Sequence, residues 1–507
     1  MCHFIYYVME GKQSSVEESE FKALKDKKLG LVSYAFLAMA IIAPLAMIVG
    51  NAAGSVTYAG MAAPLIPIIG AIFILFASVP IFEYTRYIPF AGGYYGLAEL
   101  GFGKAAGKWV ALSYIASEVF ASGVLQAGFI PFVVFTTVDL IYGVLLPIWL
   151  FFIIMILVLV WGYVSTLRNV RMTFNLIIGI VLSEIIIVII FSALGLNAAS
   201  SSLSLAPFSI GSSPTGFSGL FLGVILTGFL FYGGYGTSIP YSEEGGSSRS
   251  TLWRSLVIGI VVTAIIGVIG MYAEVSLIGA SNIGSFASSV NPAVTAFYPI
   301  VGPIGIWILI VDYILAIMMV STGMLGAGAR VIYSLGRDKF FGKKVNAYAT
   351  KLDEKRNVPS GASFIMFVMN LIVALILASL MFYFYGYYNG MFFIPFLSGS
   401  IFVAMWYFHH IIPDLAMMRA LPLKFKKKLT TPRNFLVSVV SPLGGAAIFI
   451  YAFYEGYSTL VEPYTAGLVL VFLIIVVLTI WVALKQHNGT LGRSFVEEKQ
   501  LEKIRQM

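Results

Sequence analysis

The sequence has little charge and almost no cysteine or histidine. Charged residues make up 11% of the 507 residues, whereas a soluble domain averages about 25%. The single cysteine, Cys2, excludes an intramolecular disulfide and a cysteine-based metal site. The four histidines, His3, His409, His410 and His487, show no metal-motif spacing, and no glycine-rich ATP-binding loop is present. We therefore expect no cofactor and no bound metal. With no nucleophile–base pair either, we expect no enzyme activity.

Long apolar runs dominate the chain instead. Hydrophobic residues make up 59% of it, and the mean hydropathy is +0.93. A run of about 20 apolar residues is long enough to cross a bilayer as a helix. The sequence therefore predicts an all-α membrane protein with twelve transmembrane helices. Their approximate limits are 33–55, 62–85, 105–135, 145–166, 172–195, 218–241, 252–278, 304–335, 360–384, 391–412, 434–457 and 463–484.

The basic residues predict the orientation of these helices. If the N-terminus is inside, all 31 Lys and Arg residues fall in segments on the cytoplasmic side. This predicts a multi-pass protein of the plasma membrane with both termini, 1–32 and 485–507, in the cytoplasm. The net charge of +8 then faces anionic lipid, and nucleic acid is not an expected partner. The apolar stretch before Met9 is too short for a cleavable signal, and Met9 is an alternative start.

The sixth apolar run is interrupted by glycine. Residues 231–236 read FYGGYG, and each glycine weakens a helix by about 1 kcal/mol relative to alanine. A broken helix is tolerated in lipid only where its freed backbone groups line a cavity or lie inside the protein. The break therefore indicates a binding site. A closely packed, unbroken helix is an equally good interpretation, since glycine is common in membrane helices.

The first apolar run carries a matching interruption at Pro44, which removes a backbone donor in mid-helix. Interruptions at corresponding positions of two halves indicate a transporter site at an inverted-repeat interface. We therefore expect a first repeat over 33–195, a second over 218–412, and two further helices over 434–484. The alternative for the first run is a simple proline kink.

Three stretches carry a resemblance to a known family. The first stretch, residues 89–95, reads PFAGGYY. The second, residues 231–235, reads FYGGY and is followed by YSEE at 241–244. The third, residues 329–338, reads ARVIYSLGRD, and Pro359 follows it before the ninth helix. Together they resemble the amino acid–polyamine–organocation (APC) superfamily of permeases. The resemblance implies a LeuT-type five-plus-five inverted repeat with helices 1 and 6 discontinuous, and secondary transport of amino acids or amines. The sequence departs from the family at 43–45, where Ala-Pro-Leu stands in place of Gly-Ser-Gly.

An amino acid substrate needs partners for one carboxylate and one ammonium. The N-terminus of a half-helix offers free N–H groups to the carboxylate, and unwound carbonyls attract the ammonium. Glu118 in the third helix would favour a cationic side chain or an amine. The predicted substrate-binding residues are Ile42, Ala43, Pro44, Leu45, Ala46, Met47, Glu118, Phe231, Tyr232, Gly233, Gly234 and Tyr235.

Glu184 in the fifth helix is the predicted proton carrier. Some members of the resembled family carry a lysine at the similar position, where a titrating group stands in for a sodium ion. Ser321 and Thr322 in the eighth helix are expected to add hydroxyl groups there. The alternative is a protonated Glu184 that bonds a neighbouring helix, because intramembrane acids are costly and need partners.

A gate or anchor is predicted at the cytoplasmic end. Glu244 is expected to pair with Arg249 or Arg254, and the alternative is a solvated pair. Arg330 and Arg337, with Asp338, are expected to fix the inner end of the eighth helix.

The sequence therefore predicts a secondary active transporter of amino acids that works by alternating access and is coupled to protons. Its partners are an amino acid or amine, the proton or sodium ion, and membrane lipid. A carrier of polyamines or other cationic amines, an amino acid exchanger and a non-transporting amino acid receptor are the alternatives.

Overall fold

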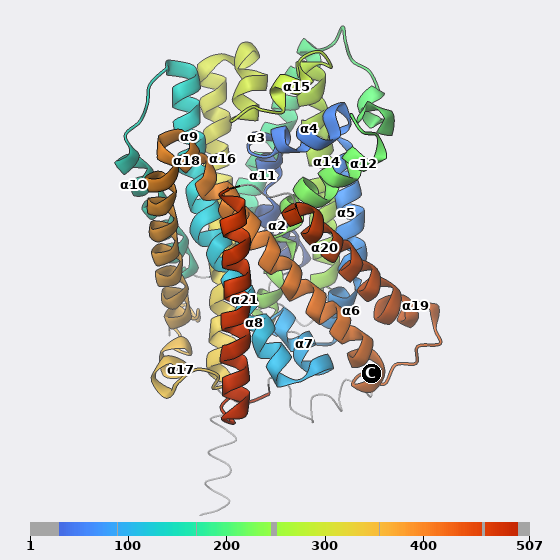
Figure 1. Ribbon diagram of the computed structural model, residues 1–507, viewed down its shortest axis with the longest axis vertical. Helices are drawn as coiled ribbons and strands as arrows, with labels where there is room; N and C mark the ends of the chain where they lie inside the picture. The colour runs from blue at the N-terminus through green and yellow to red at the C-terminus, as the bar shows by residue number, and fades with distance from the viewer. Residues whose placement is uncertain are drawn as a thin grey trace, which may run out of the picture.

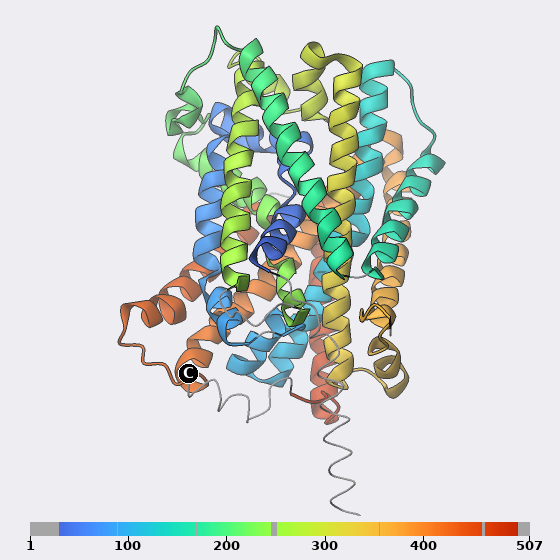
Figure 2. The same cartoon turned by 180° about the vertical axis from the view of Figure 1, so that it is seen from behind.

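The computed structural model describes residues 30–494 apart from 89, 169, 245–250, 354 and 459–461. The predicted N-terminal segment up to residue 29, the tail from residue 495, Pro89 and Arg249 lie outside this part. Every regular element within it is helical, and the long helices stand side by side in Figures 1 and 2. The prediction of an all-α membrane protein is confirmed.

The number of spans differs from the predicted twelve. Ten helices of the described chain are long and apolar enough to cross a membrane, and eleven if the pair Ala52–Ala62 and Leu65–Ala77, bent by 103°, is one span. The difference lies in α18 (Ser360–Leu423), which contains both the predicted ninth and tenth helices. Its Gly386 has φ 71° and ψ −163°, a conformation that favours glycine. Figure 1 shows α18 rising in brown and returning in orange.

The first span is broken at its centre. Helix α2 (Leu31–Ile42) ends where Ala43 turns left-handed at φ 51° and ψ 83°, and α3 (Pro44–Val49) begins at the next residue. Proline suits the first position of a helix because its N–H is not needed there. The span ends at Val49 rather than at 55, since Gly50 and Asn51 separate it from α4 (Ala52–Ala59).

The sixth span is broken as well. It consists of α12 (Phe217–Gly223), the π-helical turn η5 (Val224–Gly228), α13 (Phe229–Tyr232) and, after two glycines, the 3₁₀ segment η6 (Tyr235–Glu244). The glycines permit close packing of this segment. A Cβ atom at Gly234 would lie 2.2 Å from Cγ2 of Ile41, and one at Gly236 would lie 1.7 Å from the hydroxyl of Tyr94.

The third span is longer than predicted. It is formed by α8 (Lys104–Glu118), the π-helical η2 (Val119–Leu125) and α9 (Gln126–Tyr142), and Gly143, with a φ of 64°, ends it as a glycine cap. Helix α16 (Pro292–Arg337), which Asn291 caps through Val294 N–H, is interrupted at Gly302, where φ is 63° and ψ is −172°. The predicted eighth span, 304–335, lies in the part of α16 after this kink.

The other long helices are α5 (Leu65–Ala77), α6 (Val79–Tyr87), α10 (Ile148–Thr166), α11 (Val170–Ala198), α14 (Thr251–Ile278), α20 (Ser441–Ser458) and α21 (Tyr464–His487). The short elements are η1 (Gly60–Ala62), α7 (Tyr94–Phe102), η3 (Ala206–Phe208), η4 (Ile210–Ser212), α15 (Ile283–Phe286), α17 (Lys343–Ala349), α19 (Pro432–Phe435) and η7 (Leu436–Val440). Helices α2 and α3 lie at the centre of the bundle, in dark blue in Figure 2, and Leu37, Leu45 and Met47 are buried there.

Candidate functional site

The two broken spans meet at a small cavity in the middle of the bundle. Six of the predicted substrate-binding residues line it: Ile42, Ala43, Ala46, Met47, Phe231 and Gly234. The others, Pro44, Leu45, Glu118, Tyr232, Gly233 and Tyr235, do not. Helices α9, α16 and α18 complete the lining with Phe129, Tyr313 and Phe402 among others. The volume, ≈ 50 Å³, holds only a few water molecules. An amino acid would therefore require the lining side chains to move apart.

Two amides supply most of the side-chain polarity of this cavity. Asn51 donates from Nδ2 to the carbonyl of Ala46 at 3.3 Å. Gln126 lies at the end of the π-helical turn η2, and its Oε1 is buried without a hydrogen-bond partner in the described structure. Gln126 is not among the residues predicted from the sequence. Its sequence context nevertheless indicates a polar role, because an amide inside an otherwise apolar run needs a hydrogen-bond partner.

The carboxyl group of Glu184 reaches the N-terminus of α3. Its Oε2 accepts a hydrogen bond from the backbone N–H of Leu45 at 3.4 Å. The first N–H groups of a helix have no partner within the helix, and Pro44 has no N–H at all. Glu184 thus occupies a donor that the sequence assigns to the substrate carboxylate. It is fully buried, and its Oε1 has no hydrogen-bond partner in the described part.

The two predicted hydroxyl groups of α16 bond elsewhere. Ser321 donates to the carbonyl of Ser122 at 3.4 Å, and Thr322 donates to Met318 within its own helix at 2.8 Å. Neither has a recorded hydrogen bond to Glu184 in the described chain. Thr322 lines a separate small pocket beside Tyr241 and Arg330.

Glu118 lies outside the cavity, next to the 3₁₀ segment of the sixth span. Its Oε1 accepts a hydrogen bond from the hydroxyl of Thr237 at 3.5 Å, and its side chain is 2% exposed. Glu118 is therefore bonded to the sixth span and does not line the cavity.

Three ion pairs, two of them buried and one partly buried, close the end of the bundle beyond Glu118. Arg330 Nε donates to Glu244 at 2.6 Å, and its guanidinium carbon lies 3.6 Å from the ring centre of Tyr241. Arg337 binds both carboxylate oxygens of Glu243, at 2.7 and 3.1 Å. Glu244 thus pairs with Arg330, and of its two expected partners Arg249 lies outside the described residues. Arg330 and Arg337 are far from Glu243 and Glu244 in the sequence. Residue spacing within one loop therefore does not predict these pairs.

Asp338 at the end of α16 pairs with Lys108 rather than with an arginine of its own helix. Tyr95 donates to the same carboxylate at 3.1 Å, and Lys108 also lies 3.5 Å from Glu99. Burial raises the pKa of Asp338 above its ordinary value, while Lys108 and Tyr95 act to lower it. The ion pair thus joins α16 to α7 and α8.

A cluster of titratable residues on α18 was also missed. The ring of His410 lies 4.4 Å from that of Tyr94, and the ring of His409 lies 5.0 Å from that of Tyr114. Asp414, one turn after His410, is 1% exposed and has no hydrogen-bond partner for either oxygen within the described residues. Metal-motif spacing does not reveal these residues. Their position within an apolar run was the signal in the sequence.

Comparisons with known proteins show the family and the fold of the chain. The model of the family described as "Amino acid permease" matches residues 29–495. The solved structure of the manganese transporter of Eremococcus coleocola, in complex with an aromatic bis-isothiourea substituted compound, is similar with a TM-score of 0.54 and 10% identity. The similarity covers 97% of this chain and 96% of that one, and it shows a shared LeuT-like fold. No curated protein sequence matches the chain.

Proposed function

Since the chain belongs to the amino acid permease family, we propose that it is a secondary active transporter that moves amino acids by alternating access and is coupled to protons. The family makes it a multi-pass membrane transporter and not an enzyme. The hydrogen bond between Glu184 and Leu45 carries the proton-coupled part of this proposal, because it links a titratable group to the broken first span.

The proposal includes the topology. Helix α18 crosses the membrane twice, since 64 residues of continuous helix would be about three times longer than the bilayer core, and Gly386 supplies the turn. With the bent pair before α6 as one span, twelve spans result. The breaks at Ala43 and Gly233 are five spans apart, which supports an inverted five-plus-five repeat followed by α20 and α21.

Proton coupling follows from competition for one donor. Ionised Glu184 holds the N–H of Leu45, so a substrate carboxylate meets an occupied helix terminus. Protonation weakens Glu184 as an acceptor and frees the N–H for the substrate, because charged acceptors form the stronger hydrogen bonds. Binding of the proton therefore favours binding of the substrate, and by linkage the substrate favours the proton to the same degree.

The substrate ammonium has partners on the opposite side of the cavity. The last carbonyls of α2, around Ile42, and those before Gly233 have no continuing helix to bond them. The rings of Phe231 and Phe402 add faces that attract a cation. Gln126 is the side chain that selects among substrates. Its buried amide oxygen has no hydrogen-bond partner within the described residues and can accept one from the substrate.

The three ion pairs act as the gate of the cytoplasmic side. We assign that side to the end of the bundle with Arg330, Arg337 and Lys108, because basic loops remain in the cytoplasm. Glu244 and Glu243 of the broken sixth span are held there by α16. Movement of η6 away from α16 would separate both pairs and open the cavity inward.

Two measurements test the proposal. A thermal-shift screen of the purified protein against amino acids and polyamines identifies the substrate class. Uptake of the selected compound into proteoliposomes under an inward proton gradient, compared with an inward sodium gradient at fixed pH, then identifies the coupling ion. Uptake that follows sodium alone would contradict the proton coupling.

A further inference from the structure

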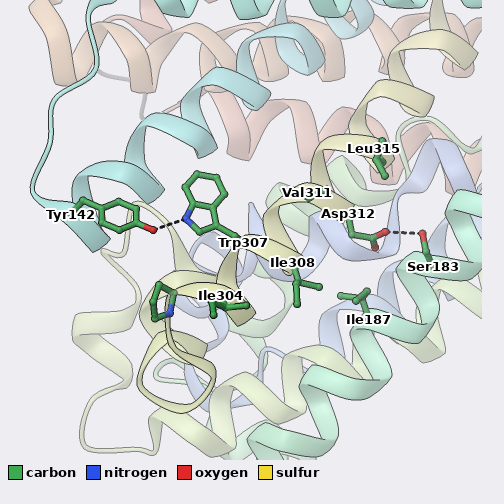
Figure 3. Close-up of a pocket in the computed structure, with 10 residues that line it drawn as sticks. Tyr142, Ser183, Ile187, Ile304, Trp307, Ile308, Val311, Asp312 and Leu315 are labelled. Atoms are coloured by element: carbon green, nitrogen blue, oxygen red, sulfur yellow. Dashed lines mark hydrogen bonds between the residues drawn. The ribbon is translucent and has the colours of Figure 1, made fainter.

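A wide groove lies on the side of the bundle, away from the central cavity. It has a volume of ≈ 640 Å³ and is lined by the end of α9, by α11 and by α16 (Figure 3). Ile304, Ile308 and Val311 are more than half exposed there, so this face meets lipid. Trp307 donates to the hydroxyl of Tyr142 at 3.0 Å, and such aromatic groups are typical of the membrane–water interface. The groove therefore extends from the interface into the apolar zone.

One carboxyl group lies in this apolar groove. Asp312 of α16 is 7% exposed, and its Oδ1 accepts a hydrogen bond from the hydroxyl of Ser183 at 2.6 Å, as Figure 3 shows. Its Oδ2 is buried without a hydrogen-bond partner in the described structure. An acid inside a membrane span is costly, about 2.5–3.5 kcal/mol on insertion scales, and such residues are usually functional.

The carboxyl group of Asp312, in the groove, lies next to that of Glu184, at the central site. Ser183, which bonds Asp312, directly precedes Glu184 on α11. Successive side chains of a helix diverge by about 100°, so α11 presents Ser183 to the groove and Glu184 to α3. Asp312 is close enough to act electrostatically on Glu184. Each carboxyl keeps one buried oxygen without a hydrogen-bond partner in the described part, Oδ2 of Asp312 and Oε1 of Glu184.

The surrounding helices offer few other charges. Helices α2, α3 and α10 contain no charged residue, α14 carries Arg254 and Glu274, and α9 carries Asp139. Helix α11 carries Arg171, 12 positions or about 18 Å from Ser183, and Arg330 on α16 is 18 positions or about 27 Å from Asp312. Within the described residues, neither Asp312 nor Glu184 forms an ion pair with a basic side chain.

We propose that Asp312 is the entry point of the coupling proton, which reaches Glu184 from the lateral groove rather than through the substrate cavity. The proton bound at Oδ2 of Asp312 passes to Oε1 of Glu184, directly or through water. Asp312 returns to its carboxylate form and is protonated again from the groove. Neutral Glu184 then releases Leu45 N–H. This inference rests on the proposed coupling role of Glu184 and adds the path to it.

A chemical test uses dicyclohexylcarbodiimide, an apolar reagent that modifies protonated carboxyl groups within membranes. We expect the intact protein in proteoliposomes to be modified at Asp312, as mapped by mass spectrometry, with the extent falling as the pH rises. Glu274, fully buried on α14 and away from the groove, is the internal control and stays unmodified. Absence of the label on Asp312, or equal labelling of Glu274, would overturn access to Asp312 from the groove.

A transport test uses Asp312→Asn and Ser183→Ala, with Glu274→Gln as the matched control. The probe is a mixture of tritiated L-amino acids, and pyranine inside the vesicles reports the protons. We expect Asp312→Asn to slow uptake driven by a proton gradient by about tenfold or more, with Ser183→Ala having a smaller effect. Exchange of labelled for unlabelled amino acids at equal pH should remain, because it needs no net proton entry.

The outcomes separate this inference from the proposed function. If the wild-type protein shows no proton-driven uptake, the proposed coupling fails. If the wild type is coupled and Asp312→Asn matches it, or if Asp312→Asn loses exchange together with proton-driven uptake, Asp312 is not the proton entry. Should Asp312→Asn not fold, Ser183→Ala provides the same comparison.

Discussion

Oε2 of Glu184 lies 3.4 Å from the backbone nitrogen of Leu45, although 139 residues separate them in the chain. The contact joins the fifth span to the half-helix α3 of the first. It places a carboxyl group at the helix terminus where a substrate carboxylate is expected to bind.

The glycine at the break of the sixth span is required by packing. An added Cβ at Gly234 would lie 2.2 Å from Ile41 and 2.9 Å from Met324. We expect Gly234→Ala to destabilise the protein by about 1–3 kcal/mol, because overpacking forces neighbours to move. Thermal unfolding in detergent measures the change. Gly179→Ala is the control, since no atom lies within 4 Å of its added Cβ. Equal melting temperatures for both variants would contradict the close approach of Gly234 to Ile41 of α2.

The gate depends on a buried charge pair. Arg330→Met leaves the carboxylate of Glu244 buried without its main partner, and breaking such a pair typically costs about 3–5 kcal/mol. We expect the single variant to melt well below the wild type and the double variant with Glu244→Gln to recover most of the loss. A double-mutant cycle on melting temperatures measures the coupling. Independent, additive effects of the two substitutions would show that the pair does not hold the gate.

Glu118 distinguishes amino acid from amine transport. It bonds Thr237 of η6 and lies outside the central cavity. We expect Glu118→Gln to leave binding of neutral amino acids intact in the thermal-shift assay. If the substrate is instead a polyamine, loss of a charged hydrogen bond worth about 1.5–3 kcal/mol should weaken its binding by tenfold or more. Binding of amines alone, abolished by Glu118→Gln, would favour the alternative carrier of cationic amines.

The sequence indicated the helices and their breaks better than the contacts between them. Apolar runs predicted the spans because lipid requires about 20 apolar residues, and Pro44 and the glycines at 233 and 234 indicated the breaks through local backbone chemistry. Helix ends were less well predicted. The third span ends at Tyr142 rather than at 135, because its glycine cap at Gly143 depends on the conformation of a single residue.

Partners distant in the chain were not predictable. Glu244 and Arg330 are 86 residues apart, and Lys108 and Asp338 are 230 apart. Their pairing depends on how α16 packs against η6 and α8, which a single sequence does not specify. The lone amide of Gln126 in an apolar run indicated a polar role, but its place in the cavity depends on the π-helical turn before it.

The most direct test of the coupling is the accumulation of substrate by Glu184→Gln in proteoliposomes. With one proton per substrate, the wild type should concentrate its amino acid about tenfold for each unit of inward pH gradient, since one unit corresponds to about 1.4 kcal/mol. Glutamine keeps the size of the side chain but carries no exchangeable carboxyl proton. We predict that this variant equilibrates the amino acid without concentrating it. Accumulation by the variant equal to that of the wild type would contradict Glu184 as the proton carrier.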